Sequence, residues 1–187
     1  LSARRIFSAE AEFCVVLGVT LEPRRRRYSE AEVWAAVERV VLCIELCGAR
    51  QFRSEDRLHY VADALLGAAV VMGPSLGRVA EPASLPRARV RLLVGGVEIS
   101  SGDATSNPGD SPLASLALLA NELCVERGQR LEAGAVVICG HCCQAAFRGR
   151  PKPPLDGAGP PEAAWREGDK LRAEFEGLGA VEVTLLD

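Results

Sequence analysis

The chain has 187 residues, of which 48% are hydrophobic and 25% charged, and its formal net charge at pH 7 is −3. These values describe a soluble globular chain and exclude a disordered segment or a polybasic tail. Charged residues or glycines interrupt every apolar run before it reaches the ~20 residues of a membrane helix, which excludes a membrane-spanning protein. The acidic balance argues against general binding to nucleic acid, so the basic run from Arg24 to Arg27 is interpreted as a solvated loop.

The length predicts a single domain over residues 1–187. The first residue is Leu1 and not methionine, so we expect a fragment or a processed product whose targeting signal, if it has one, lies outside this sequence.

The first third of the chain predicts a strand, a helix and a second strand. Residues 10–18 begin with alternating polarity and become continuously apolar, as a strand entering a core does. Ser29 and Glu32 have the spacing of a capping box. Apolar residues follow at helical spacing: Val33, Val37 and Val40. Residues 41–47 then form an apolar run that predicts a strand ending at Gly48.

The middle of the chain contains an ambiguous segment and a hairpin. Residues 61–72 are small and apolar, and either a buried strand or a short helix fits them. Residues 88–100 alternate on both sides of Gly95-Gly96, which predicts a hairpin with a tight turn.

The last part of the chain predicts one helix and three strands. Ser111-Pro112 is an N-cap and first-turn pair, and Gly128 closes the helix. An apolar stripe runs along it: Leu116, Leu119 and Leu123. Strands are expected at 135–139, 170–175 and 180–186, with a loop insertion at 149–164. Many strands with two clear helices indicate an α+β domain built on a rolled or sandwiched sheet.

Seven cysteines lie mostly in apolar segments: Cys14, Cys43, Cys47, Cys124, Cys139, Cys142 and Cys143. An odd number in such segments is typical of reduced, buried thiols and not of a secreted disulfide framework. An alternative is a zinc site in which residues 139–143, including His141, supply one half and Cys43 with Cys47 the other. The sequence places no base beside Cys142 or Cys143 that would make either one a nucleophile.

The sharpest signal for chemistry is the pair Glu10 and Glu12. Side chains at i and i+2 of a strand point to the same face, and two carboxylates held that close normally need a cation. Glu45 is the only acid in the apolar run that ends at Cys47, where burial of an unpaired carboxylate is costly and a metal would relieve the cost. Three carboxylates and waters suit Mg²⁺ or Mn²⁺. In the alternative, Glu10 and Glu12 face solvent on an edge strand and Glu45 pairs with an arginine.

Several separated motifs occur in one order. They are Glu10-Ala-Glu12-Phe-Cys-Val-Val-Leu-Gly18, Ile44-Glu45-Leu-Cys-Gly-Ala-Arg50, Val61-Ala-Asp63, the run from Ser111 to Asn121, Gly128, the segment 131–140, and Gly168-Asp169 ahead of Leu178-Gly179-Ala-Val181. In this order they resemble the fumarylacetoacetate hydrolase superfamily, and within it the 2-keto-4-pentenoate hydratase branch. The resemblance runs from about Glu10 to Leu186.

The resemblance implies a mixed β-roll or sandwich of the fumarylacetoacetase C-terminal type. It also implies that Glu10, Glu12 and Glu45 hold Mg²⁺ or Mn²⁺ and that a small 2-oxo acid or its enol chelates this ion. The glutamate at position 45 favours the hydratase and decarboxylase branch over the acylpyruvase-like one. A divalent ion there would stabilise enolate charge, which permits ketonisation and then addition of water to the conjugated double bond.

The resemblance also shows departures. It places a catalytic lysine before the Glu-x-Glu strand, in an N-terminal segment that this sequence lacks, and neither Lys152 nor Lys170 matches that place. Gly48-Ala49 stands where relatives carry Asp-Ser, and Ala64 stands where they carry asparagine.

Three further polar residues are weighed for a role. His141 lies where relatives have a Thr-Gly-Ser-like turn, and it is either a substitute acid or base or a plain loop histidine. Arg50 matches the family arginine and binds either a strand glutamate or a substrate carboxylate. His59 is interpreted as structural.

The expected function is a metal-dependent hydratase, a lyase that adds water to 2-hydroxy-2,4-dienoates such as 2-keto-4-pentenoate. The alternatives are a related 2-oxo acid decarboxylase and a diverged, non-catalytic homologue that acts as a binding or assembly subunit. The resemblance further implies a homo-oligomer whose partner is a small-molecule substrate. The expected location is the cytoplasm.

Overall fold

The structure is a computed structural model that describes residues 6–48, 57–78, 82–148, 164–184 and 186. Arg50 and almost all of the expected insertion at 149–164 lie outside these ranges. Three α-helices are present in the described residues: α1 (Glu30–Ala36), α2 (Arg57–Ala62) and α3 (Pro112–Ala120). No helix in the described part of the chain is long and apolar enough to cross a bilayer.

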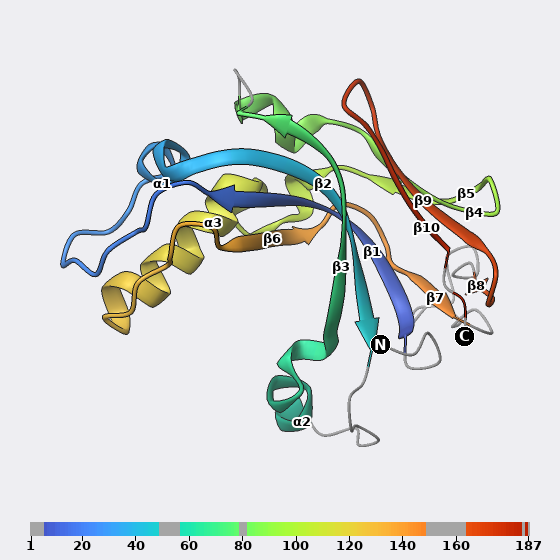
Figure 1. Ribbon diagram of the computed structural model, residues 1–187, viewed down its shortest axis with the longest axis horizontal. Coiled ribbons are helices and arrows are strands. Elements are labelled where there is room, and N and C mark those ends of the chain that lie inside the picture. The colour runs from blue at the N-terminus through green and yellow to red at the C-terminus, as the bar shows by residue number, and fades with distance from the viewer. Residues whose placement is uncertain (1–5, 49–56, 79–81, 149–163, 185, 187) are drawn as a thin grey trace.

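The strands form two sheets (Figure 1). The larger sheet has the order β3-β2-β1-β7-β8, with β6 also paired to β1. Its strands are β1 (Ile6–Leu17), β2 (Val37–Gly48), β3 (Gly67–Gly77), β6 (Val136–His141), β7 (Ala146–Arg148) and β8 (Ala164–Trp165). The smaller sheet has the order β10-β9-β4-β5 and consists of β4 (Val90–Val94), β5 (Val97–Gly102), β9 (Lys170–Phe175) and β10 (Gly179–Thr184). This architecture confirms the expected α+β class with two antiparallel sheets and few helices.

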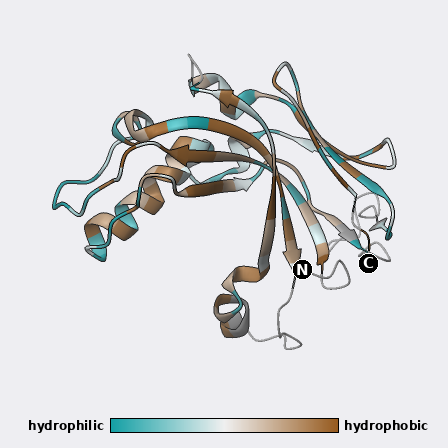
Figure 2. Ribbon diagram, viewed as in Figure 1, coloured by the Kyte–Doolittle hydropathy of each residue, from teal (hydrophilic) through white to brown (hydrophobic). Residues whose placement is uncertain are grey.

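The long antiparallel pair β1 and β2 is the centre of the molecule, and its two faces differ in character. One face, which carries Ala11, Phe13, Leu42 and Ile44, belongs to the main core. Phe13 packs edge-on against Phe175 of the smaller sheet, with ring centroids 5.0 Å apart. Apolar residues accordingly follow much of β1 and β3 in Figure 2. The opposite face carries a second, smaller apolar cluster of buried residues: Cys14, Val16, Val41 and Cys43.

The helix that begins after Ser29 is shorter than expected. Its capping box is confirmed, because the Glu32 amide donates to Ser29 Oγ and the Ser29 amide donates to the Glu32 carboxylate. The expectation that Val37 and Val40 lie on this helix is wrong, since both belong to β2. Their β-branched side chains favour a strand. Pairing with β1 gives their backbone amides and carbonyls the hydrogen-bond partners that a longer helix would otherwise supply.

The ambiguous segment 61–72 contains both elements that the sequence left open. Helix α2 ends at Ala62 and strand β3 begins at Gly67. The segment is not buried, because Val61 is 66% exposed and Met72 is 44% exposed. β3 is an edge strand whose only hydrogen-bonded neighbour in the described sheet is β2, and one of its faces packs against β10 and the main core.

The remaining elements agree with the sequence. β4 and β5 form the expected hairpin, with positive φ at Gly95 and Gly96. Ser111 caps α3, whose chain continues as a π-helical segment at Asn121–Glu126 before Gly128. The strands β6, β9 and β10 correspond to those expected at 135–139, 170–175 and 180–186.

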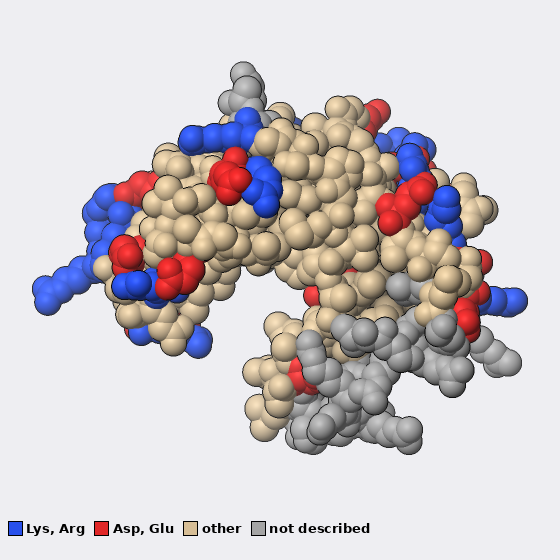
Figure 3. All heavy atoms as spheres, viewed as in Figure 1, with Lys and Arg blue, Asp and Glu red and all other residues tan. Residues whose placement is uncertain are grey.

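The basic run 24–27 lies outside helices and strands, as expected of a loop. Arg24 forms an ion pair with Glu32 at 2.8 Å and Arg27 one with Glu126 at 3.3 Å. In Figure 3 charged side chains of both signs intermingle towards the two ends of the visible face, and fewer of them lie in its middle.

A bulge where β6 pairs with β1 turns a backbone amide toward the β1 carboxylates. Glu12 pairs with His141 and Cys14 with Ile138, so β6 carries one extra residue between these positions. Gly140, in this bulge, has a φ of +111°, and its amide donates to Glu12 Oε2 at 2.8 Å. The side chain of Asn107 fixes the bulge by donating to the carbonyl of Cys139 at 2.7 Å and to that of Gly140 at 2.6 Å.

We predict that Gly140→Ala destabilises the protein. A Cβ at position 140 would lie 2.6 Å from Asn107 Nδ2, in addition to the strain of positive φ. The free energy of unfolding, measured by urea denaturation, should fall by about 2 kcal/mol or more. The matched control is Gly128→Ala, where φ is +63° but a Cβ meets nothing within 4 Å, and the expected loss is about 1 kcal/mol. Equal losses in the two variants would contradict the role of the Asn107 contact.

We also predict that Glu32 stabilises the protein in a pH-dependent way. Hydrogen bonds from Arg24 and from the Ser29 backbone hold the pKa of Glu32 below its usual range. A lowered folded-state pKa gives stability that is present above the unfolded-state pKa and is lost as the pH falls through the folded-state pKa. The melting temperature of Glu32→Gln should therefore lie below that of the wild type at pH 7, and the difference should shrink below pH 4. A Glu126→Gln control, which loses one contact between two exposed side chains, should show little change at either pH.

Candidate metal centre

The three expected metal ligands lie on the same face of the β1 and β2 pair. Glu10 is directly opposite Glu45 in the register of the two strands. Glu12 follows at i+2 on β1, and alternation along the strand places it on the face of Glu10. The structure therefore brings together the three carboxylates that the sequence singled out. The alternative of solvent-facing glutamates on an edge strand is wrong, because β1 has partners on both sides and Glu12 is only 2% exposed.

Glu12 is the most deeply placed of the three acids. Burial raises the pKa of Glu12 to about 8, against the opposing effect of the Gly140 amide, and the neighbouring negative charges of Glu45 and Glu10 raise it further. The side-chain interaction between Glu12 and Glu45 also raises the pKa of Glu12. Burial, followed by the charge of Glu10, also raises the pKa of Glu45. The carboxylates of this cluster therefore repel one another, because they lie close together with little solvent to screen their charges.

A cysteine that the sequence considered only for a zinc site, and not for the carboxylate site, belongs to the same cluster. Cys47 follows Glu45 at i+2 on β2, and its thiol lies 3.8 Å from Glu10 Oε1. One ligand atom from each of Glu10, Glu45 and Cys47 lies within 4.8 Å of the other two. Glu12 is outside this closest group. Burial raises the pKa of the Cys47 thiol to about 12.

His141 lies on the other flank of Glu12. It stands directly opposite Glu12 in the β1 and β6 register, and its Nδ1 lies 3.7 Å from Glu10 Oε2. The side chain is 57% exposed, and it lines a cavity of about 330 Å³. The other lining residues described are Ser101, Gly102, Asp103, Ser106, Cys142, Cys143 and Gln144. An imidazole therefore borders both the carboxylate cluster and an open cavity.

The zinc alternative drawn from the cysteines is not supported by the described residues. The close group found there contains Cys47 with two glutamates and does not join Cys139, His141 and Cys142 to Cys43. All seven cysteines are free and buried, as the preferred interpretation stated. Burial raises the pKa of Cys142 and of Cys143, so neither is an activated nucleophile.

The sequence missed two features that support the cluster. One is the Gly140 amide with the Asn107 side chain behind it, which only the bulge brings to Glu12. The other is Cys47 at i+2 from Glu45, which was interpreted as a buried thiol or as part of a zinc site with Cys43 and residues 139–143, and not as a neighbour of the glutamates. The side chains of Arg50 and His59 are outside the described residues.

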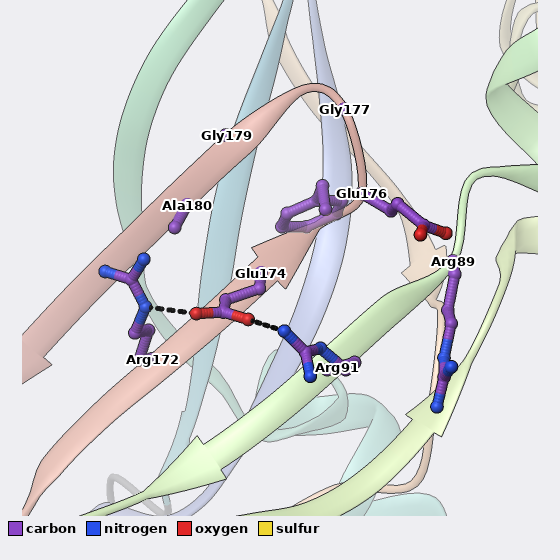
Figure 4. A pocket seen from close by; sticks show the side chains of 9 residues that line it. Arg89, Arg91, Arg172, Glu174, Glu176, Gly177, Gly179 and Ala180 are labelled. Atoms are coloured by element: carbon purple, nitrogen blue, oxygen red, sulfur yellow. Dashed lines mark hydrogen bonds and ion pairs between the residues drawn. The ribbon is translucent and has the colours of Figure 1, made fainter. Parts of the chain in front are cut away.

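A larger cavity of about 480 Å³ lies on the smaller sheet, away from these carboxylates (Figure 4). Its arginines are paired within the sheet. Glu174 accepts from Arg91 and, at 2.7 Å, from Arg172 Nε, while Arg89 lies 3.6 Å from Glu98. Because nearby acids balance the charge of these guanidinium groups, the residues that line the cavity are interpreted as a network of surface ion pairs. The cavity is therefore not interpreted as an anion-binding site.

The cluster is chemically suited to a divalent cation. Carboxylate oxygens are the donors that hard divalent ions prefer, and an ion among them would offset the mutual repulsion that raises the pKa of Glu12 and Glu45. Glu10, Glu12 and Glu45 offer oxygen donors and Cys47 offers sulfur, while His141 lies at the open side, 3.7 Å from Glu10 Oε2.

Solved structures share this fold. The chain is 25% identical to 4-oxalocrotonate decarboxylase from Pseudomonas putida G7 complexed with calcium and acetate, at a TM-score of 0.72 over 95% of this chain and 59% of that one. The same enzyme complexed with magnesium and adipate matches at 24% identity, a TM-score of 0.72 and the same coverage. The 5-carboxymethyl-2-hydroxymuconate delta-isomerase from Mycobacterium smegmatis matches at 14% identity and a TM-score of 0.59, over 97% of this chain and 59% of that one.

The chain thus spans about three fifths of the length of these proteins. No curated protein sequence matches it. The family model for the fumarylacetoacetate (FAA) hydrolase C-terminal region matches residues 2–186. Together with two antiparallel sheets and a carboxylate cluster on the central strand pair, this match shows that the chain belongs to the fumarylacetoacetate hydrolase C-terminal family.

Proposed function

We propose that the chain is the catalytic part of a divalent-metal-dependent enzyme that acts on a small 2-oxo acid or its dienol. The reaction proposed first is hydration of a 2-hydroxy-2,4-dienoate such as 2-keto-4-pentenoate. The observation that carries the proposal is the convergence of Glu10, Glu12 and Glu45 on one strand-pair face, with His141 between them and an open cavity.

The proposed ion is Mg²⁺ or Mn²⁺, held by Glu10, Glu12 and Glu45. The matched decarboxylase structures contain magnesium or calcium, which supports a hard divalent ion in this fold. When bound, such an ion acts as a Lewis acid toward the carboxylate and the 2-oxygen of the substrate.

The protein's own groups have separate roles in this proposal. The Gly140 amide holds the Glu12 carboxylate in place. Glu10 and Glu45 are less buried than Glu12, so they are more accessible to a substrate. His141 is partly exposed and borders the cavity, so it is the described side chain best placed to move a proton to or from a bound dienol. Arg50 is proposed to bind the substrate carboxylate, by its match to the family arginine.

Decarboxylation of a related 2-oxo acid is the second candidate. The observation that favours it is the likeness to 4-oxalocrotonate decarboxylase at 25% identity. Hydration and decarboxylation both develop charge on an enolate oxygen, so the same carboxylate cluster serves either reaction. The two reactions differ in the bond involved: hydration adds water to a carbon–carbon double bond, and decarboxylation breaks the bond to a carboxylate. The residues around the rest of the substrate select between them.

Metal binding is the first test. Isothermal titration calorimetry with MgCl₂ and MnCl₂ should show saturable binding, and thermal unfolding should shift upward, because an ion that binds only the folded state stabilises it by about 2.7 kcal/mol at 100 times its Kd. The double variant Glu10→Gln, Glu45→Gln should lose both responses.

In EDTA this double variant should unfold at a temperature equal to or above that of the wild type, because two like charges are removed from the cluster. The control Glu38→Gln changes an exposed acid on the same strand and should bind like the wild type. If neither the wild type nor the control responds to millimolar metal, the proposed function is wrong for this chain.

Activity then separates the candidate reactions. Addition of water to 2-hydroxypenta-2,4-dienoate removes the absorbance of the dienol, whereas decarboxylation of 4-oxalocrotonate releases CO₂. We expect His141→Asn to lower kcat by about 100-fold, within the range of general acid–base catalysis, with little change in metal affinity. It should also remove one limb of the pH profile of kcat.

An unchanged pH profile in His141→Asn would contradict the role of this residue. No turnover of either substrate by the metal-loaded chain would instead support the non-catalytic alternative, a binding or assembly subunit.

A further inference from the structure

The carboxylate cluster contains a thiol that the proposed function does not use. Cys47 is 8% exposed, and alternation along β2 places it on the face of Glu45. Its thiol lies 3.8 Å from Glu10 Oε1, and one ligand atom from each of Glu10, Glu45 and Cys47 lies within 4.8 Å of the others. The cluster therefore offers a soft donor beside two hard ones.

These separations are somewhat wider than those of atoms that share one ion. In a tetrahedral zinc site, thiolate sulfur at about 2.3 Å and carboxylate oxygen at about 2.0–2.2 Å from the ion lie about 3.6 Å apart, against 3.8 Å between the Cys47 thiol and Glu10 Oε1. Small rotations of the side chains would bring all three donors to one ion.

The other cysteine on this face of β2 is turned to a different partner. Cys43 donates to the backbone carbonyl of Glu12 at 3.3 Å and is fully buried. Outside the sheet, Cys124 likewise donates to the carbonyl of Leu21 at 3.3 Å. Cys47 differs because its thiol, which also interacts with the Ser8 side chain, reaches a carboxylate of the cluster.

We infer that Cys47 is a metal ligand in this cluster and that it shifts the preference of the site from Mg²⁺ toward thiophilic divalent ions, of which Zn²⁺ and Co²⁺ are the probes. Thiolates bind these ions far better than Mg²⁺, which takes oxygen donors. On binding, the S–H bond of Cys47 breaks, its proton leaves to solvent and a sulfur–metal bond forms, with no change of oxidation state. The inference rests on the proposed function, because it concerns the ion of the same site.

Cobalt tests this inference without an activity assay. Titration of the wild type with CoCl₂ should produce a thiolate-to-cobalt charge-transfer band in the near ultraviolet, and Zn²⁺ should abolish the band by competition. In Cys47→Ser the band should disappear and the affinity for Zn²⁺ should fall at least about tenfold, while the affinity for Mg²⁺ changes by less than about threefold. The matched control Cys124→Ser keeps the cluster intact and should retain the band.

X-ray absorption at the zinc edge of the wild type gives a second readout that needs no variant. A sulfur neighbour at about 2.3 Å is expected, and a shell of oxygen and nitrogen alone would overturn the inference. The inference also fails if the cobalt band persists in Cys47→Ser. If Mg²⁺ binding in that case still depends on Glu10 and Glu45, the proposed function stands. If the wild type binds none of these ions, both fail together.

Discussion

The antiparallel register of β1 against β2 is the constraint on which the rest of the structure depends. It sets Glu10 opposite Glu45 on one face and Phe13 opposite Leu42 on the other. Because side chains alternate along a strand, a slip of one residue would carry the carboxylates into the main core and the apolar residues out of it. Burial of the apolar face thus fixes the geometry of the polar one, and packing of the smaller sheet through Phe175 reinforces that choice.

The carboxylate cluster makes folding less favourable, and the favourable free energy of the rest of the fold offsets this cost. Acids held together under burial have raised pKa values, as Glu12 and Glu45 do, and such a site persists only where its surroundings determine it strongly. Here the β1 and β2 ladder holds two of the acids from their backbones. The third is held by an amide of the β6 bulge, which Asn107 keeps in place. The bulge is therefore part of the site and not an irregularity beside it.

This face carries groups of different chemical hardness. Carboxylates lie on both strands of the central pair, the Cys47 thiol lies on β2 beside Glu45, and the imidazole of His141 lies on the cavity side. An enolate needs a Lewis acid and a proton carrier, and the arrangement offers a place for the first beside the second. Members of the family with different reactions share the sheets, so the reaction of any one member depends on the residues around the substrate.

The sequence alone determined the family, the α+β class, most of the strands and the three glutamates, because strand alternation and caps are local signals and the motif order is specific. It could not determine that the helix after Ser29 stops at Ala36, since pairing of Val37 with β1 is a contact between distant segments. Nor could it find the amide of Gly140, which reaches Glu12 only through a bulge. Cys47 reads as one more apolar strand residue until the register places it beside Glu10. Local patterns fix which residues can share a face, and only the pairing of strands decides which of them meet.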